Sequence, residues 1–195
     1  MTVGGALLFP GAGSSRTQPA LVAVERALVD AYGTGFAVVR ADFPYRREGR
    51  RAPDRAPKLI ACVVEEAGLL ASKAGVDPAT VVLGGRSMGG RMCSMAVAEG
   101  LPAAGLALIS YPLHPPGRGD NLRIAHFPDL HVPCLFVSGT RDPFGTPEEL
   151  ESHTRAIPGP VTHVWIEGGR HDLKGADTQV AEAVTSWAQG LQDKP

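Results

Sequence analysis

The sequence has few cysteines, and their arrangement does not suggest a metal site. Its 195 residues contain three, Cys62, Cys93 and Cys134, without the short paired spacings of zinc ligands. Two of them fall in helical patterns and the third in an apolar strand pattern. We therefore expect buried free thiols in a reducing compartment. We expect no disulfide framework, no metal and no other cofactor.

An excess of charge of one sign is also absent. Lys and Arg number 19, Asp and Glu number 20, and the formal net charge is −1. Because a nucleic-acid-binding protein needs a broad basic surface, we do not expect a nucleic-acid partner. The densest basic run, residues 46–55, also contains Glu48 and Asp54. It is interpreted as a solvated loop, with a position at a pocket rim as the alternative.

Long apolar runs are missing as well. No segment approaches the roughly 20 apolar residues that cross a bilayer. The N-terminus lacks the basic start and long apolar stretch of a secretory signal. We therefore expect no membrane association and predict a cytoplasmic protein. The length and the hydrophobic fraction of 44% are sufficient for one core, so residues 1–195 are expected to form a single domain.

Short apolar runs alternate along the chain with longer amphipathic ones. The short runs predict strands at Ala6–Phe9, Ala37–Arg40, Val81–Leu83, Gly105–Ile109, Cys134–Ser138 and Val161–Ile166. The longer runs predict helices at Gln18–Ala31, Lys58–Ala74, Met88–Ala98, Pro147–Ala156 and Thr178–Leu191. Such alternation is typical of an α/β fold with a parallel sheet covered on both faces. Ligands of these sheets bind beyond the carboxyl ends of the strands.

The most informative motif follows the third predicted strand. Residues 85–89 have the form G-x-S-x-G, with Ser87 in the middle and Gly84 and Gly90 on either side. A nucleophile elbow has this form, because the serine must project from a strained strand-to-helix turn and small neighbours let other backbone approach. The alternative is a tight strand-to-helix turn without catalytic meaning.

Two later residues complete a candidate triad. A serine hydroxyl needs a base, and the base needs a carboxylate that orients it. In the nucleophile-elbow arrangement the acid and then the histidine follow the serine along the chain. Asp142 comes directly after the strand Cys134–Ser138, and His171 directly after Val161–Ile166. Each candidate therefore follows the carboxyl end of its own strand.

Other ionisable residues compete for these roles. Asp172 is interpreted as a local structural partner, and Glu167 has a less suitable loop position than Asp142. His114 follows a strand and is a candidate for the pocket wall. His163 lies inside a strand pattern and is expected to be packed or at an edge. The remaining histidines are expected at the surface, namely His126, His131 and His153.

The oxyanion of an acyl-transfer reaction needs two N–H donors. One is expected from Met88, the residue after the nucleophile. The second is expected from the small-residue loop after the first strand, with Ala12 preferred and Gly11 or Gly13 as alternatives. Substrate contacts are expected from Gly11, Gly13, Tyr45, Arg86, Tyr111 and His114. For Arg86, Arg118 and Arg141, an ion pair with a nearby acid competes with binding of a substrate carboxylate.

With these motifs, the chain resembles the small, lidless α/β-hydrolases of the dienelactone-hydrolase-like kind. More closely, it resembles the bacterial branch related to the hydrolase-like subunit of the NSL chromatin complex and to testis-expressed hydrolase-like proteins. The matching segments are 10–13, 42–45, 84–91, 111–117, 139–144 and 169–174. The resemblance implies a three-layer α/β-hydrolase fold with Ser87 as nucleophile, Asp142 as acid and His171 as base.

The chain departs from the family pattern at two positions. Pro10 replaces the usual loop histidine, which removes a side chain and an N–H. Leu173 stands where a phenylalanine is common, and a changed pocket wall is expected there. No insertion between Gly105 and Cys134 is long enough for a cap domain, so an open site is expected, with residues 113–130 as the only candidate flap.

Three functions agree with these features to different degrees. The leading hypothesis is a serine hydrolase for small-molecule esters or thioesters of small acyl groups. The second is a catalytically idle hydrolase fold that serves as an interaction module. The third is a dinucleotide-binding oxidoreductase, suggested by Gly11, Gly13 and Asp42 but weakened because Arg16 stands where a third glycine is needed. The natural substrate and the oligomeric state stay open.

Overall fold

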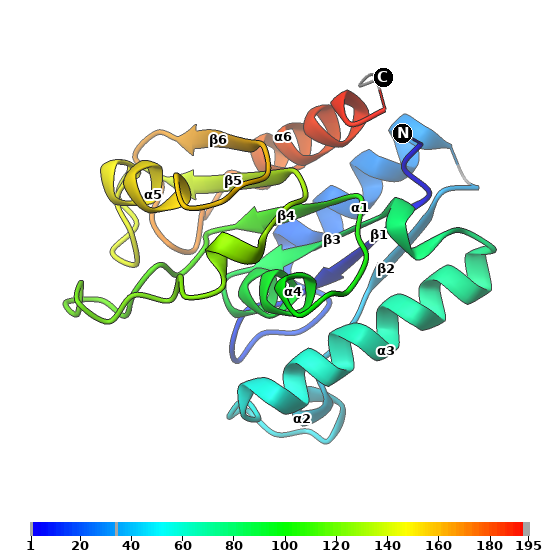
Figure 1. Cartoon of the computed structure of the whole chain (residues 1–195), viewed down its shortest axis with the longest axis horizontal. Helices are drawn as coiled ribbons and strands as arrows, with labels where there is room; N and C mark the ends of the chain where they lie inside the picture. Colours follow the sequence, from blue (N-terminus) through cyan, green and yellow to red (C-terminus); the bar gives the residue numbers. More distant parts are fainter. Residues whose placement is uncertain (1, 34, 193–195) are drawn as a thin grey trace.

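In the computed structural model, which describes residues 2–33 and 35–192, a six-stranded parallel sheet lies between two layers of helices (Figure 1). The strands are β1 (Gly5–Phe9), β2 (Ala37–Arg40), β3 (Val81–Arg86), β4 (Gly105–Ile109), β5 (Cys134–Gly139) and β6 (Val161–Ile166). The helices are α1 (Pro19–Tyr32), α2 (Pro44–Arg47), α3 (Ala56–Ala74), α4 (Met88–Ala98), α5 (Pro147–Thr154) and α6 (Asp177–Gly190), with 3₁₀ turns η1 (Pro78–Thr80) and η2 (Phe127–Asp129). The predicted α/β-hydrolase arrangement is therefore confirmed.

The strand order β2-β1-β3-β4-β5-β6 determines where a ligand site can form. The chain runs from β1 outward to β2 and then returns past β1 to β3, so the connections after β1 and β3 leave in opposite directions. Phe9 at the end of β1 is in register with Gly85 in β3. The loop after β1 consequently lies beside the start of α4, at the kind of switch point where α/β sheets bind ligands.

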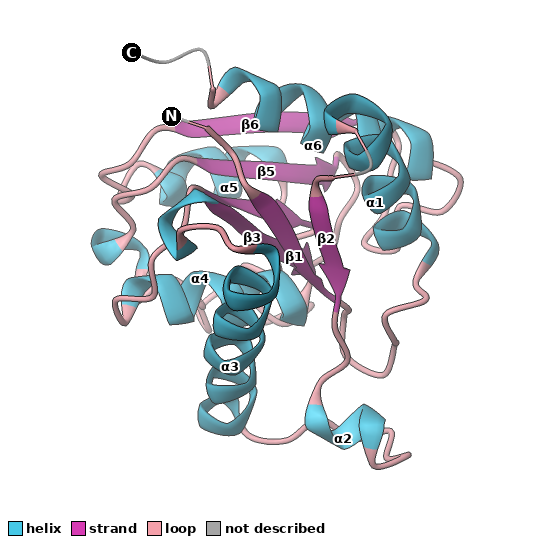
Figure 2. Ribbon diagram, turned by 90° about the vertical axis from the view of Figure 1, so that its right-hand side faces the viewer, coloured by secondary structure: helices cyan, strands magenta, loops and turns pink. Residues whose placement is uncertain are grey.

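The two faces of the sheet are covered by different helices. Leu7 and Phe9 of β1 contribute to the core beneath α3 and α4, whereas Ala6 and Leu8 contribute to the core beneath α1 and α6. This alternation follows from the two-residue side-chain period of a strand. Figure 2 shows the two helix pairs on opposite sides of the sheet. The inner strands β1, β3, β4 and β5 are thus buried on both faces, as their apolar runs predict, whereas the edge strands β2 and β6 are half-buried.

Local signals explain several element ends. Thr146 caps α5: its hydroxyl accepts from the Glu149 amide, and the Glu149 carboxylate accepts from the Thr146 amide. Gly75 ends α3 in a left-handed conformation with φ 66°. β3 continues to Arg86 because its ladder with β4 reaches Ile109, whereas the apolar run alone predicted an end at Leu83.

The segment between β4 and β5 has no cap domain in the described chain. Residues 110–133 form a long loop whose regular structure is the short turn η2, and Figure 1 shows this loop in green beyond the end of β4.

No helix within residues 2–33 and 35–192 is both long and apolar enough to span a bilayer. All three cysteines are buried and free, as predicted.

Candidate active site

Ser87 occupies a strained turn between β3 and α4. Its backbone has φ 50° and ψ −114°, values that a residue with a side chain rarely adopts. The turn is held because the Ser87 amide donates to the Ile109 carbonyl at 2.8 Å, which continues the β3–β4 ladder. The conformation lifts the hydroxyl out of the sheet, where other loops can reach it.

Two glycines allow the close packing that holds this turn. A Cβ added at Gly85 would lie 2.2 Å from the Phe9 carbonyl oxygen, and one added at Gly89 would lie 2.3 Å from the same atom. Both distances are far inside van der Waals contact with backbone, which has little freedom to move. The motif therefore requires glycine at these two positions because the end of β1 packs directly against the turn.

His171 lies between Ser87 and Asp142. Its Nε2 is 2.9 Å from the Ser87 Oγ, and its Nδ1 is 2.8 Å from Asp142 Oδ2 and 3.0 Å from Oδ1. The Asp142 side chain is 1% exposed and the His171 side chain 19%. The predicted nucleophile, base and acid thus form one continuous chain of hydrogen-bonded side chains, although they come from three separate loops.

The loops that carry the acid and the base are bonded to each other. The Arg141 amide donates to the Gly169 carbonyl at 2.9 Å, and the Gly168 amide donates to the Thr140 hydroxyl at 2.9 Å. The Phe144 ring stacks on the His171 imidazole with centroids 3.9 Å apart. These contacts restrict the imidazole to the plane in which it meets both partners.

The amides of the loop after β1 differ in their hydrogen bonding. The Gly11 amide donates to the Gln18 side chain at 3.3 Å, and the Gly13 amide donates to the Tyr45 hydroxyl at 3.2 Å. Between them, the Ala12 amide has no acceptor among the described residues. Met88 is the first residue of α4, so its amide also lacks an acceptor within the helix. Two free donors therefore flank Ser87.

A pocket of about 450 Å³ contains these groups. It is lined by Gly11, Ala12, Arg86, Ser87, Met88, Arg91, Pro112, Arg123, Phe144 and His171. A larger hollow of about 570 Å³ lies between β6 and α6, but its lining contains no histidine. The candidate site is therefore assigned to the pocket that holds the nucleophile and base candidates.

Comparison with known proteins assigns the chain to a family. A family model described as Alpha/beta hydrolase domain matches residues 5–193. The chain belongs to this alpha/beta hydrolase family.

Solved structures support the same fold for this α/β hydrolase. Est1E from Butyrivibrio proteoclasticus has a TM-score of 0.76 at 16% identity, and the match covers 99% of this chain and 90% of that one. Dienelactone hydrolase from Anabaena variabilis has a TM-score of 0.75 at 21% identity, with 97% and 87% covered. The esterase domain of a Rhodothermus marinus protein has a TM-score of 0.70 at 18% identity, with 97% and 88% covered. At such identities the likeness establishes the fold.

Four of the expected substrate contacts lie outside the pocket lining of this hydrolase. Gly13 uses its amide to bond the Tyr45 hydroxyl, and the Tyr45 ring is fully buried. Tyr111 is also buried and donates its hydroxyl proton to the Arg123 carbonyl at 2.6 Å. His114 is 6% exposed and contacts the Glu149 carboxylate at 3.4 Å. These side chains stabilise the loops behind the pocket wall and do not reach its interior.

Two further expectations need correction. His126, expected at the surface, is half-buried, and its Nε2 lies 2.8 Å from the Ser94 hydroxyl. Leu173, expected to alter the pocket wall, is 2% exposed and packs in the core beneath α1 and α6. Its backbone has φ 46°, so the tight turn after His171 directs this side chain inward.

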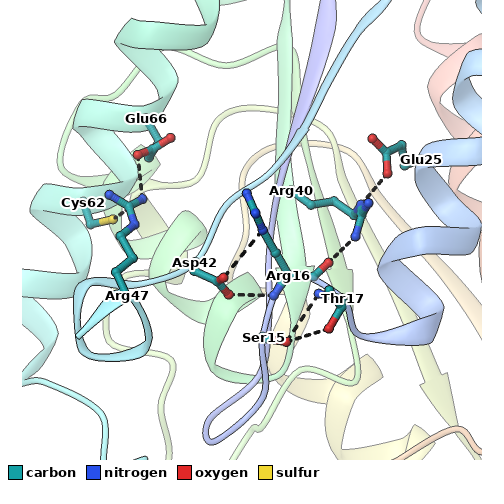
Figure 3. Close-up of polar contacts among 9 residues, drawn as sticks. All are labelled: Ser15, Arg16, Thr17, Glu25, Arg40, Asp42, Arg47, Cys62 and Glu66. Atoms are coloured by element: carbon teal, nitrogen blue, oxygen red, sulfur yellow. Dashed lines mark hydrogen bonds and ion pairs between the residues drawn. The ribbon is translucent and has the colours of Figure 1, made fainter. Parts of the chain in front are cut away.

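Asp42 shows why the dinucleotide hypothesis fails to explain this loop. Its carboxylate accepts from the Arg16 amide at 2.6 Å and lies 3.8 Å from the Arg16 Nε (Figure 3). The Arg40 side chain, on the other side of the loop, bonds both the Arg16 carbonyl and the Glu25 carboxylate. The carboxylate that a ribose would need is therefore occupied in holding the loop after β1.

Sequence reasoning missed four residues of the pocket lining, Arg91, Pro112, Arg123 and Phe144. Arg91 was open to prediction, because the residue four positions after Ser87 on a helix lies on the same face. Arg123 and Pro112 depend on the path of a long loop, and no pattern in the sequence indicates that path. Phe144 lies in the segment 139–144 that matches the family pattern, but the residue pattern offers no reason to assign it a role.

Proposed function

We propose that this α/β hydrolase cleaves esters or thioesters of small molecules, with Ser87 as nucleophile, His171 as general base and Asp142 as the acid that orients it. The observation that carries the proposal is the His171 imidazole, bonded to Ser87 Oγ at 2.9 Å on one side and to Asp142 Oδ2 at 2.8 Å on the other. A buried carboxylate on Nδ1 keeps the proton there, so that Nε2 is free to accept the serine proton.

The acylation half of the reaction follows from these positions. As Ser87 Oγ attacks the carbonyl carbon, its proton moves to His171 Nε2. The negative charge that develops on the carbonyl oxygen is stabilised by the free amides of Ala12 and Met88. Each such donor is worth about 10²–10³ in rate. Collapse of the tetrahedral intermediate breaks the bond to the alcohol or thiol, which takes the proton from His171.

Deacylation repeats the sequence with water. His171 accepts a proton from a water molecule that attacks the acyl carbon, and it then returns the proton to Ser87 Oγ as the acid product forms. The pocket volume of about 450 Å³ suits a small acyl group and part of its leaving group. Burial raises the pKa of Cys62 to about 11 and that of Cys134 to about 12, so neither thiol competes with Ser87 as a nucleophile near neutral pH.

A fluorophosphonate probe tests the nucleophile. We expect it to label the wild-type protein at Ser87 and to inhibit hydrolysis of p-nitrophenyl acetate. The Ser87→Ala variant is expected to lose both labelling and hydrolysis. Ser152→Ala, on the exposed side of α5, is the matched control and should retain both. Hydrolysis by Ser87→Ala at the wild-type rate would refute the mechanism.

The same experiment separates the proposal from an interaction module. The resemblance to the NSL complex subunit and the testis-expressed proteins leaves a module that binds partners without catalysis as the alternative. Such a module would not react with the probe. Folded wild-type protein that stays unlabelled would therefore favour the interaction module over the enzyme.

A further inference from the structure

The candidate pocket has an unusual charge. Three of its lining residues are arginines, Arg86, Arg91 and Arg123, and none is an aspartate or glutamate. The carboxylate of Asp142 lies behind the imidazole of His171 and is bonded to it. The walls around the Ser87 hydroxyl therefore carry positive charge that no lining carboxylate balances.

Arg86 is engaged by the protein itself. Its guanidinium donates to the main-chain carbonyl of His171. Burial lowers the pKa of Arg86, and the negative charges of Asp172, Asp142 and Asp177 oppose that shift. Arg86 thus acts as a positioning residue that holds the loop of the proposed base, and it has less capacity for a substrate anion.

No ion pair joins Arg86, Arg91 or Arg123 to an acidic side chain in residues 2–33 and 35–192. Arg91 and Arg123 differ from Arg86 because, in that part of the chain, their guanidinium groups also have no bond to a main-chain carbonyl. The Nε of Arg91 is buried and has no hydrogen-bond partner in the described chain. The arginines near the other edge of the sheet contrast with this pair: Arg47 bonds Glu66 at 2.6 Å, and Arg16 and Arg40 also face carboxylates (Figure 3).

The backbone holds both unpaired arginines beside the nucleophile. The Arg91 amide donates to the Ser87 carbonyl at 3.0 Å, which places Arg91 one helical turn after the serine. The Arg123 amide donates to the Leu113 carbonyl at 2.8 Å, and its carbonyl accepts from the Tyr111 hydroxyl at 2.6 Å. Because both its amide and its carbonyl are hydrogen-bonded, the Arg123 backbone is fixed, and its side chain stays in the pocket lining.

Neighbouring titratable groups do not supply a counter-charge. Burial raises the pKa of Tyr111, so its hydroxyl stays neutral beside Arg91 and Arg123. Burial and the charge of Arg91 lower the pKa of His126 to about 4, so this imidazole is neutral near pH 7. Two guanidinium groups thus share a half-buried site without an anion. Such groups bind carboxylate and phosphate oxygens strongly and directionally.

We propose that Arg91 and Arg123 bind an anionic group, a carboxylate or a phosphate, on the ester or thioester that Ser87 attacks. This assignment rests on the proposed function and narrows the substrate class from small esters in general to esters that carry a negative charge. The anion would fill the position between α4 and the loop 110–133 while the reacting carbonyl lies at Ser87.

Paired esters test the assignment. Mono-p-nitrophenyl adipate and p-nitrophenyl hexanoate have acyl chains of equal carbon number and differ in the terminal carboxylate. 4-Acetoxybenzoate and phenyl acetate share the acetyl group, and only the leaving group of 4-acetoxybenzoate has a carboxylate. We expect the wild-type protein to show a higher kcat/KM for the anionic member of at least one pair, by roughly tenfold for each charge-assisted contact.

Variants show whether the two arginines cause that preference. Arg91→Gln and Arg123→Gln should each lower the ratio of kcat/KM for the anionic ester to that for the neutral ester. Arg91→Lys, which retains the charge, should keep part of the ratio. Arg118→Gln is the matched control, because Arg118 lies on the same loop, is exposed and does not line the pocket. It should leave both reactions unchanged.

Two measurements do not depend on the folding of a variant. Added salt should reduce the anionic preference of the wild-type protein, because screening weakens charge attraction. Competitive inhibition by adipate and by phenyl phosphate shows which anion is preferred, and inhibition by either supports the assignment. Inhibition by neither, or an equal kcat/KM within both ester pairs, would overturn it.

The outcomes separate this inference from the proposed function. Absence of fluorophosphonate labelling and of p-nitrophenyl hexanoate hydrolysis refutes the function. Hydrolysis of the neutral esters without any anionic preference refutes only the arginine site. Equal loss of both reactions in Arg91→Gln and Arg123→Gln would show that these arginines are structural, which also overturns the assignment.

Discussion

Replacing Asp142 by Asn should change the tautomer of His171 and leave the fold intact. Asp142 Oδ1 accepts from the Phe144 amide at 2.9 Å, so in the variant the amide oxygen of Asn must take this position. Its NH₂ group then takes the position of Oδ2, 2.8 Å from His171 Nδ1. A protonated Nδ1 would face another donor there, and the ring proton therefore moves to Nε2.

The new tautomer removes the general base and keeps the hydrogen bonds of residue 142 to Phe144 and His171. With its proton on Nε2, the imidazole cannot accept the proton of Ser87 Oγ. We expect kcat for p-nitrophenyl acetate to fall by roughly 10⁴, the loss that a wrong tautomer causes in a serine triad. This fall equals about 5.5 kcal/mol of activation free energy. The free energy of unfolding should change by no more than about 1 kcal/mol, because every hydrogen bond keeps a partner.

Steady-state kinetics and urea unfolding measure the two effects separately. Asp172→Asn is the matched control: it removes the neighbouring carboxylate, which is exposed and has no bond to the imidazole. It should retain wild-type kcat. Asp142→Asn with most of the wild-type kcat, or Asp172→Asn with an equally large loss, would refute this role for Asp142.

Two stability predictions follow from the packing and from buried charge. Gly89→Ala places a Cβ 2.3 Å from the Phe9 carbonyl oxygen, and urea unfolding should show a free energy of unfolding lower by about 1–3 kcal/mol. The control is Gly68→Ala, exposed in α3 with no atom within 4 Å of the added Cβ, which should be neutral or stabilising. An equal loss of stability in the two variants would contradict the packing argument. Burial lowers the pKa of His126 to about 4 in the folded state, so the unfolded chain binds more protons between about pH 6.5 and 4, and stability should fall as pH falls through this window. Urea unfolding at neutral pH and at about pH 4.5 should show a smaller fall for His126→Gln than for wild type, whereas the exposed control His131→Gln should follow the wild type.

The fold was predictable because every strand, and every helix except α2, has a strong local signal. β4 and β6 begin and end where the apolar runs do, and α4 has the predicted bounds. α2 was missed, since four residues that begin with a proline carry no helical period. β3 was predicted too short because its last residues, Gly84 to Arg86, are required by the turn and not by strand propensity.

The candidate triad was predictable for a topological reason. In a parallel sheet the carboxyl ends of all strands meet at one edge, so residues directly after β3, β5 and β6 are neighbours whatever their separation along the chain. The roles of Tyr45 and Tyr111 were not predictable in this way. Each lies near a strand end, but its hydroxyl points to a backbone group behind the wall, and only the packed side chains decide that direction.

The same distinction separates the chemistry of the site from its choice of substrate. Ser87, Asp142 and His171 are held by the sheet and by the bonds between the loops after β5 and β6. Arg123 belongs to the loop 110–133, where its amide donates to the Leu113 carbonyl and its carbonyl accepts from the Tyr111 hydroxyl, both in the same loop. A change in this loop therefore alters the charge above Ser87 without moving the imidazole. Relatives that share the triad and differ between β4 and β5 should differ in substrate charge, while their reaction stays the same.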